Sequence, residues 1–174
     1  TGETNLFRRM YDTLKPGDVV LADALFDDYF IACELCNRGI HIVARAQYER
    51  TGTWTAESRP DGDIIVWQRP QKPRGMTREQ YRSYPKHLVM RQVPVDARDK
   101  NNRVKQFNVV TTILDKAIEG KQIGDLFERR WHGEVDIRSI KSTMQMDILR
   151  CKTPAMVHKE IWIHLLAYNL LRTV

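Results

Sequence analysis

Residues 19–44 read VVLADALFDDYFIACELCNRGIHIVA, and this stretch decides the fold class. Its first four residues form a continuous apolar run, the pattern of a strand buried on both faces. Apolar residues then recur at helical spacing over 29–36, and Gly39 suits the C′ position that ends a helix. A second apolar run follows at 40–44. A strand, a helix and a strand of this length favour two parallel strands in a covered α/β sheet.

Regular patterns continue on both sides of this stretch. Leu6, Met10 and Leu14 lie four residues apart, which predicts an amphipathic helix that ends before Pro16. Beyond residue 46, short alternating apolar runs separated by turn-forming residues predict antiparallel strands. These runs lie at 53–55, 64–67, 88–90 and 93–95.

The last third of the chain combines one strand with helices. The run 107–114 is apolar and β-branched, which predicts a strand. Helical patterns follow at 121–130, at 134–144 and from Pro154 onward, with Thr153 as N-cap. We therefore predict three segments: part of an α/β core (1–46), a β-rich basic insertion (47–105), and a return to the core with the final strand and helices (106–174).

The charge of the chain is concentrated in one segment. The 174 residues include 28 Lys and Arg against 22 Asp and Glu, a net charge of +6, in an otherwise ordinary globular composition. Residues 69–105 hold eleven basic and three acidic residues, so their net charge of +8 exceeds that of the whole chain. The basic residues are Arg69, Lys72, Arg74, Arg78, Arg82, Lys86, Arg91, Arg98, Lys100, Arg103 and Lys105. We expect salt-sensitive contact with nucleic-acid phosphates here, with Arg74, Arg78 and Arg82 among the contacts.

Several classes of protein are disfavoured. The most apolar stretch, 161–171, is interrupted by His164 and Asn169, so no membrane span is predicted. Residues 1–10 contain no apolar signal segment, and three cysteines cannot complete a disulfide framework. We expect a cytoplasmic protein. The chain starts within a helical pattern and ends on an apolar one, so we expect it to be a piece of a longer protein.

The clearest chemical motif is FERRWHGEVDIRSIK, residues 127–141. Phe127, Arg130, Glu134 and Lys141 are separated by three, four and seven residues, so on a helix they share one face, and Arg138 lies one turn after Glu134. One interpretation is an exposed ladder of ion pairs. The other is a functional carboxylate among cations on a packed helix.

A second acidic residue, Asp23, directly follows the predicted strand 19–22. Metal and ligand sites of open α/β sheets lie outside the carboxyl ends of strands, so this position suits a metal ligand. The alternative is a turn or helix-capping Asp. A carboxylate at a strand end and another on a helix, here Glu134, are the hard oxygen ligands that Mg²⁺ prefers.

These residues resemble the IS4 group of DDE transposases. The segment GDVVLADALF, residues 17–26, resembles the group's second-aspartate segment, and Phe127-x2-Arg130-x3-Glu134-x6-Lys141 is similar to its Y-x2-R-x3-E-x6-K signature. The segment HLLAYNLLR, residues 164–172, resembles its C-terminal helix. Phe127 stands where Tyr is usual, so that position offers no hydroxyl to a DNA phosphate.

The resemblance implies an RNase H-like α/β core, truncated at its N-terminal side, with a β-rich insertion before the final helices. It assigns Asp23 and Glu134 as the second and third metal-binding acids, and Arg130 and Lys141 as contacts to the DNA backbone. It implies two Mg²⁺ or Mn²⁺ ions, and strand cleavage and transfer at transposon ends. The first Asp is expected outside this chain, so the piece alone should be inactive. The implied partners are double-stranded DNA, from both transposon ends and target, and a second copy in a homodimer of the bacterial cytoplasm.

Two other interpretations remain. The chain could be a non-catalytic DNA-binding remnant of a decayed transposase, or an RNase H-like nuclease of another kind. Cys33 and Cys36 are interpreted as core thiols in preference to half a zinc site. Trp54 and Trp67 are interpreted as packing residues, with stacking on an extruded base as the alternative.

Overall fold

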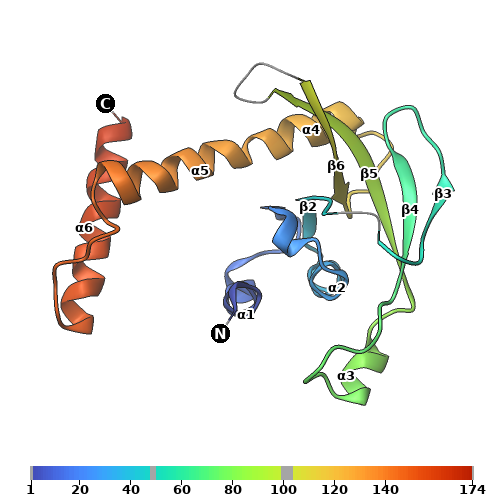
Figure 1. The fold of residues 1–174 in the computed structure, drawn as a ribbon, viewed down its shortest axis with the longest axis horizontal. Coiled ribbons are helices and arrows are strands. Elements are labelled where there is room, and N and C mark those ends of the chain that lie inside the picture. The colour runs from blue at the N-terminus through green and yellow to red at the C-terminus, as the bar shows by residue number, and fades with distance from the viewer. Residues whose placement is uncertain (1, 48–49, 99–103, 174) are drawn as a thin grey trace. The chain divides into compact units, whose positions relative to one another are not determined.

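The computed structural model describes residues 2–47, 50–98 and 104–173 (Figure 1). The chain divides into two compact units, Thr1–Phe127 and Glu128–Val174. The first contains the sheet and the second contains helices.

A six-stranded mixed sheet forms the centre of the first unit. Its strands follow the order β1-β2-β6-β5-β4-β3. Their bounds are β1 Val19–Ala22, β2 His41–Arg45, β3 Thr53–Glu57, β4 Asp63–Gln68, β5 His87–Arg98 and β6 Val104–Thr111. The pair β1 and β2 is parallel, and every other neighbouring pair is antiparallel. The predicted parallel strand–helix–strand unit is therefore confirmed.

Strand β1 differs from the expectation of a strand buried on both faces. It lies at one edge of the sheet and pairs with β2. Val19 is 38% exposed, whereas Ala22 at the other end is buried. The fully buried run is that of β2, where Ile42, Val43 and Ala44 have neighbouring strands on both sides. An apolar run does not distinguish a central strand from an edge strand, so the prediction assigned β1 too much burial.

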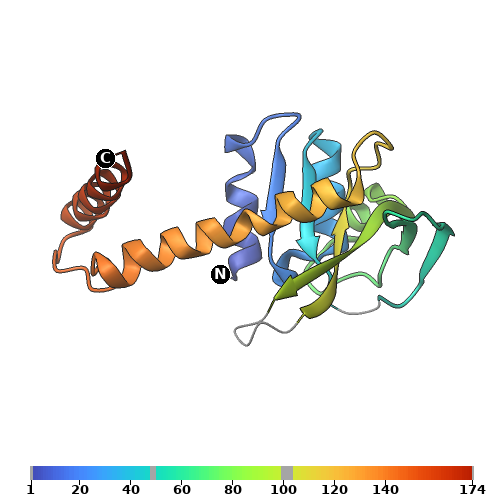
Figure 2. The ribbon, with the colours of Figure 1, turned by 90° about the horizontal axis from the view of Figure 1, so that it is seen from above.

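Helices cover both faces of this sheet (Figures 1 and 2). Helix α2 (Tyr29–Asn37) starts at Asp28, whose carboxylate accepts hydrogen bonds from the N–H groups of Phe30 and Ile31, and the chain leaves it through Gly39 at φ +70°. It packs in a core with Ile42, Ala44, Ile65, Trp67, Met90 and Val110. On the other face, Ile123 and Phe127 of α4 (Gly120–Glu128) pack with Val43, Val93, Val95 and Val109. Alternate residues of a strand thus enter opposite cores.

The predicted runs 88–90 and 93–95 belong to a single strand, β5. Its register with β4 ends at Gln92, opposite Asp63, while its register with β6 continues through Pro94 to Arg98. Pro94 has no backbone N–H to donate. Beyond Gln92, however, β5 has no β4 partner, so no hydrogen bond to β4 is lost there. Strands β3, β4 and β5 arise from segment 47–105 and join the same sheet as β1 and β2. The three-segment division of the chain stays a prediction.

Three smaller elements complete the first unit. Helix α1 (Glu3–Arg9) and a 3-10 turn (Tyr11–Thr13) precede β1, where one helix was predicted. Helix α3 (Arg78–Ser83) lies between β4 and β5. Residues 69–86, which contain α3, are called the basic excursion below.

The second unit contains α5 (Arg130–Arg138), a π-helical turn (Ser139–Thr143) and α6 (Pro154–Thr173). Arg130 and Glu134 belong to one helix, which begins four residues earlier than the predicted 134–144. The carbonyl of Thr153 accepts from the N–H of Val157, as expected at a helix start. Within the described residues, no helix is both long and apolar enough to cross a membrane.

Candidate functional site

Asp23 lies where the sequence predicted it, immediately after β1. Its side chain is exposed, and its Oδ1 accepts a hydrogen bond of 2.9 Å from the N–H of Leu25, at the start of the 3-10 turn Ala24–Phe26. The turn-capping role weighed for Asp23 is therefore present. A carboxylate has two oxygens and about four acceptor positions, so capping through one oxygen is compatible with metal binding.

The motif helix pairs two of the predicted residues. Nη1 of Arg130 donates to Oε1 of Glu134, one turn later in α5. The Arg130 side chain is 19% exposed and that of Glu134 is 41% exposed, so the pair is accessible on the carboxylate side. One pair of the exposed ladder weighed for this motif is therefore present, and it is compatible with a functional role for Glu134.

The other motif residues are in different surroundings. Phe127 is 1% exposed and packs against Phe107 in the core of the first unit, with ring centroids 5.8 Å apart. Arg138 and Lys141 are exposed. Lys141 belongs to the π-helical turn, so the predicted face, which assumed α-helical spacing throughout, does not extend to it.

The donor chemistry of Asp23 and Glu134 suits a hard divalent cation, because both offer carboxylate oxygens. Asp23 belongs to the first unit and Glu134 to the second. Among the residues that the structure describes, no group of three or more His, Cys, Asp or Glu is placed to hold a metal ion. The two acids are therefore candidate metal ligands, and the described residues do not provide a complete metal site.

The basic excursion presents a cationic surface. Arg74, Arg78 and Arg82 are exposed, and Arg78 and Arg82 lie one turn apart on α3. Lys72, Lys86 and Lys105 are also exposed. Lys100 and Arg103 lie outside the described residues. These exposed cations are where the predicted phosphate contacts would form.

Two arginines of the predicted basic run are engaged by the protein itself, Arg91 fully buried and Arg69 partly buried, which corrects the expectation for that run. Arg91 is 1% exposed and donates to the carboxylate and carbonyl of Asp61 and to the carbonyl of Ile118. Arg69 donates through Nη1 to the carbonyls of Tyr81 and Tyr84. A count of charges along the sequence includes these arginines, because the local sequence does not show that distant carbonyl groups bind them.

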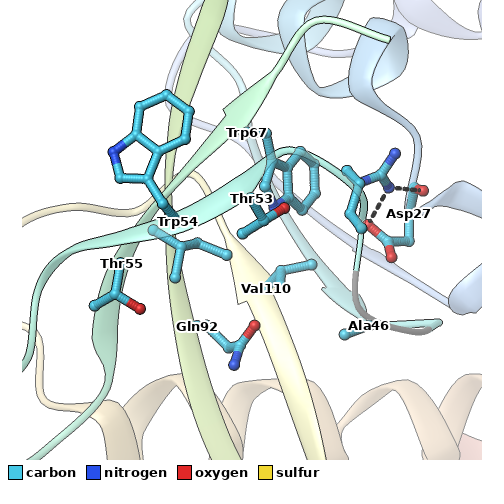
Figure 3. Close-up of a pocket in the computed structure, with 10 residues that line it drawn as sticks. Asp27, Ala46, Thr53, Trp54, Thr55, Trp67, Gln92 and Val110 are labelled. Atoms are coloured by element: carbon cyan, nitrogen blue, oxygen red, sulfur yellow. Dashed lines mark hydrogen bonds and ion pairs between the residues drawn. The ribbon is translucent and has the colours of Figure 1, made fainter.

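A pocket of about 270 Å³ opens between β3, β4 and the end of β2 (Figure 3). Its lining residues are Asp27, Ala46, Arg50, Thr53, Trp54, Thr55, Ile65, Trp67, Gln92 and Val110. The guanidinium of Arg50 is paired with Asp27 and lies 4.2 Å from the ring centroid of Trp67. The Thr53 hydroxyl is buried and makes no hydrogen bond within the described residues.

The two tryptophans of this pocket have different roles. Trp67 is 3% exposed and belongs to the core, as the packing interpretation expected. Trp54 is 45% exposed and meets His87 edge to face, with ring centroids 5.3 Å apart. The packing interpretation therefore fits Trp54 less well, and stacking on an extruded base stays the untested alternative for it. Sequence reasoning missed Arg50 and Asp27, which are 23 residues apart and carry no shared motif.

A mixed α/β unit with an acid at the end of a parallel strand, followed by a helix carrying an Arg–Glu pair, agrees with one known class of protein. The family model for the transposase DDE domain matches residues 1–170, so the chain belongs to that family.

A curated relative indicates which type of DDE transposase the chain resembles. The chain is 42% identical over 71 residues to the transposase InsG for insertion sequence element IS4 of Escherichia coli (strain K12). The match covers 39% of this chain and 16% of that protein. The resemblance to DDE transposases of the IS4 type is thereby confirmed.

Proposed function

We propose that this chain is part of the catalytic domain of a transposase that cleaves DNA strands at transposon ends and transfers them to target DNA. The observation that carries the proposal is the exposed carboxylate of Asp23 at the carboxyl end of β1, beside the parallel strand β2. Ligand sites of α/β sheets gather at such ends. Membership of the transposase DDE-domain family supports the same chemistry.

In this proposal Asp23 and Glu134 hold two Mg²⁺ or Mn²⁺ ions together with a first Asp outside the chain. When bound, such ions supply charge stabilisation for the attacking and leaving oxygens of phosphoryl transfer. Arg130 orients one oxygen of Glu134 through its ion pair. Without the first Asp, the chain alone would bind metal weakly and cleave nothing.

DNA binding is assigned to cations of both units. Arg130, Arg138 and Lys141 would bind phosphates at the motif of residues 127–141, and Arg74, Arg78 and Arg82 would bind the duplex at the basic excursion. In the complete protein we further propose a homodimer, acting on paired ends in the bacterial cytoplasm. Measuring the mass of the protein–DNA complex in solution tests the dimer.

The test of catalysis uses the complete transposase that contains this chain, incubated with Mg²⁺ and a plasmid carrying the element's own ends. Glu134→Gln should abolish strand cleavage while DNA binding survives. Glu128→Gln is the matched control, because Glu128 is an exposed acid shortly before the motif pair and its change removes the same charge. Asp23→Asn should behave as Glu134→Gln does. Cleavage retained in the Glu134 variant would contradict the proposal.

A non-catalytic DNA-binding remnant is the second candidate. The observation that favours it is the exposed cationic surface of the excursion, which needs neither acid. In that case the unmodified complete protein would bind DNA and cleave none, and neither acid variant would change its behaviour.

A further inference from the structure

The basic excursion is internally braced. At its base, the N–H of Arg69 donates to the carbonyl of Lys86 at 2.8 Å, continuing the β4–β5 pairing. Thr77 and Gln80 form a reciprocal capping box at the start of α3. The excursion is thus folded locally and does not depend on a ligand for its backbone hydrogen bonds.

Arg69 lies at the centre of this brace. Its Nη1 donates to the carbonyl of Tyr81 at 2.8 Å and to that of Tyr84 at 2.7 Å. Its guanidinium carbon lies 4.1 Å from the ring centroid of Tyr81. Both carbonyls are at the C-terminal end of α3, where helical carbonyls lack partners and a cation is favourable.

The same end of α3 is attached to α2. The hydroxyl of Tyr84 donates to Oε1 of Glu34 at 2.7 Å, and its ring meets Phe30 edge to face at 4.9 Å. Burial and the Glu34 carboxylate raise the pKa of Tyr84, so its hydroxyl remains a donor at neutral pH. The hydroxyl of Tyr29 donates to the carbonyl of Pro85. The excursion is therefore fixed to the first unit.

The solvent-facing side of the basic excursion carries cationic side chains that are not part of these internal contacts. Arg74, Arg78 and Arg82 are exposed, and Glu79 is the single acid in residues 69–86. Hydrogen bonds and packing hold the backbone that carries these three cations. Cations on a fixed backbone lose less conformational entropy on binding than cations on a flexible basic loop would.

We propose that Arg69 is a positioning residue for DNA binding: it contacts no phosphate, and it holds α3 so that Arg74, Arg78 and Arg82 meet the duplex backbone together. The proposal rests on the DNA binding proposed above. Arg69 thus has a different role from Arg74, Arg78 and Arg82: it binds backbone carbonyls of the excursion, and they bind the DNA phosphates.

The experiment measures binding of this chain to a short duplex of arbitrary sequence across a salt series. Arg69→Lys keeps the charge but loses the planar guanidinium, which lies over the Tyr81 ring while its Nη1 donates to two carbonyls. We expect the affinity of this variant to be about tenfold lower at every salt concentration, because its loosened excursion must be ordered on binding. The salt slope should not change, because the same phosphates are neutralised. Arg9→Lys is the matched control and should bind as the unmodified chain does, because Arg9 is exposed and lies outside the excursion.

Two further measurements guard against simple misfolding. Tyr84→Phe removes the hydroxyl contact to Glu34 without any change of charge, and should also lower affinity at an unchanged slope. Trypsin should cut after Arg74 and Arg78 faster in the Arg69→Lys chain while the rest of the first unit stays resistant.

Wild-type binding by Arg69→Lys, with a smaller salt slope in Arg69→Gln, would make Arg69 a phosphate contact and overturn the inference. An unmodified chain that binds no DNA at low salt would overturn the proposed DNA binding as well, so the two failures are distinct.

Discussion

The buried guanidinium of Arg91 in β5 is held by the carboxylate of Asp61, which lies in the turn before β4. The same carboxylate accepts from the N–H of Gly120 at 3.2 Å, and Arg91 also donates to the carbonyl of Ile118 at 2.6 Å. One ion pair thus joins the sheet to the loop and first residue of α4. Arg91 itself is 1% exposed, so its charge lies in the interior of the first unit.

Removing the acid of this pair should destabilise the first unit strongly. Asp61→Ala leaves the Arg91 guanidinium buried without its counter-ion, which costs about 3 kcal/mol, the lower end of the range because Asp61 itself is 41% exposed. Urea unfolding followed by circular dichroism measures it. The control is Asp12→Ala, which breaks the exposed Arg38–Asp12 pair and should change stability by less than about 1 kcal/mol. Equal effects of the two changes would refute the role given to Asp61.

Gly120 should not tolerate a methyl group. A Cβ there would clash with the carbonyl oxygen of Asp61 and lie 2.9 Å from its carbonyl carbon, so backbone would have to move, and Gly120→Ala should destabilise by about 3 kcal/mol. Gly124→Ala in the same helix is the control. Its Cβ would meet a methyl of Val95 at 3.4 Å, an ordinary contact, and alanine favours the helix. Thermal unfolding of both variants measures the difference. Similar melting temperatures would contradict the close approach of Gly120 to the Asp61 carbonyl.

The excursion should account for much of the salt dependence of DNA binding. Replacing Arg74, Arg78 and Arg82 by Gln should make the log–log salt slope shallower by about 0.9 for each phosphate that the variant no longer neutralises. A triple change of the exposed residues Arg9, Lys15 and Lys116 to Gln removes the same charge elsewhere in the first unit. Fluorescence anisotropy at several salt concentrations measures both. An equal slope change in the two triples would indicate a general charge effect and no dedicated surface.

Cys33 should resist alkylation in the folded chain. It is 2% exposed, and burial raises its pKa to about 12. The reactive form of a thiol is the thiolate, so a raised pKa lowers reactivity at every pH below it. Labelling of Cys33 by iodoacetamide should stay slow between about pH 7 and 10 and become fast after addition of urea. Mass spectrometry identifies the labelled site, and rapid labelling of folded Cys33 at pH 8 would show that it is accessible.

The local elements followed from local sequence. The apolar runs 19–22 and 40–44, the helical spacing over 29–36 and the glycine at position 39 act over a few residues, and they predicted the strand–helix–strand unit that the structure contains. The motif from Phe127 to Lys141, with the segments 17–26 and 164–172, carried the resemblance to the family, and the family match over residues 1–170 supports it. Spacing could not tell that Phe127 belongs to a core and Lys141 to a π-helical turn.

What the sequence determined by itself is the strand–helix–strand unit of residues 19–44, the concentration of basic residues in 69–105, and the acids Asp23 and Glu134 as candidates. The tertiary structure alone decided which cations are available: Arg91 is buried, Arg69 is partly buried against backbone carbonyls, and Arg74, Arg78 and Arg82 are exposed. The reason is physical. A guanidinium is retained inside only where carbonyls or a carboxylate receive it, and the partner of Arg91 is 30 residues away in the chain.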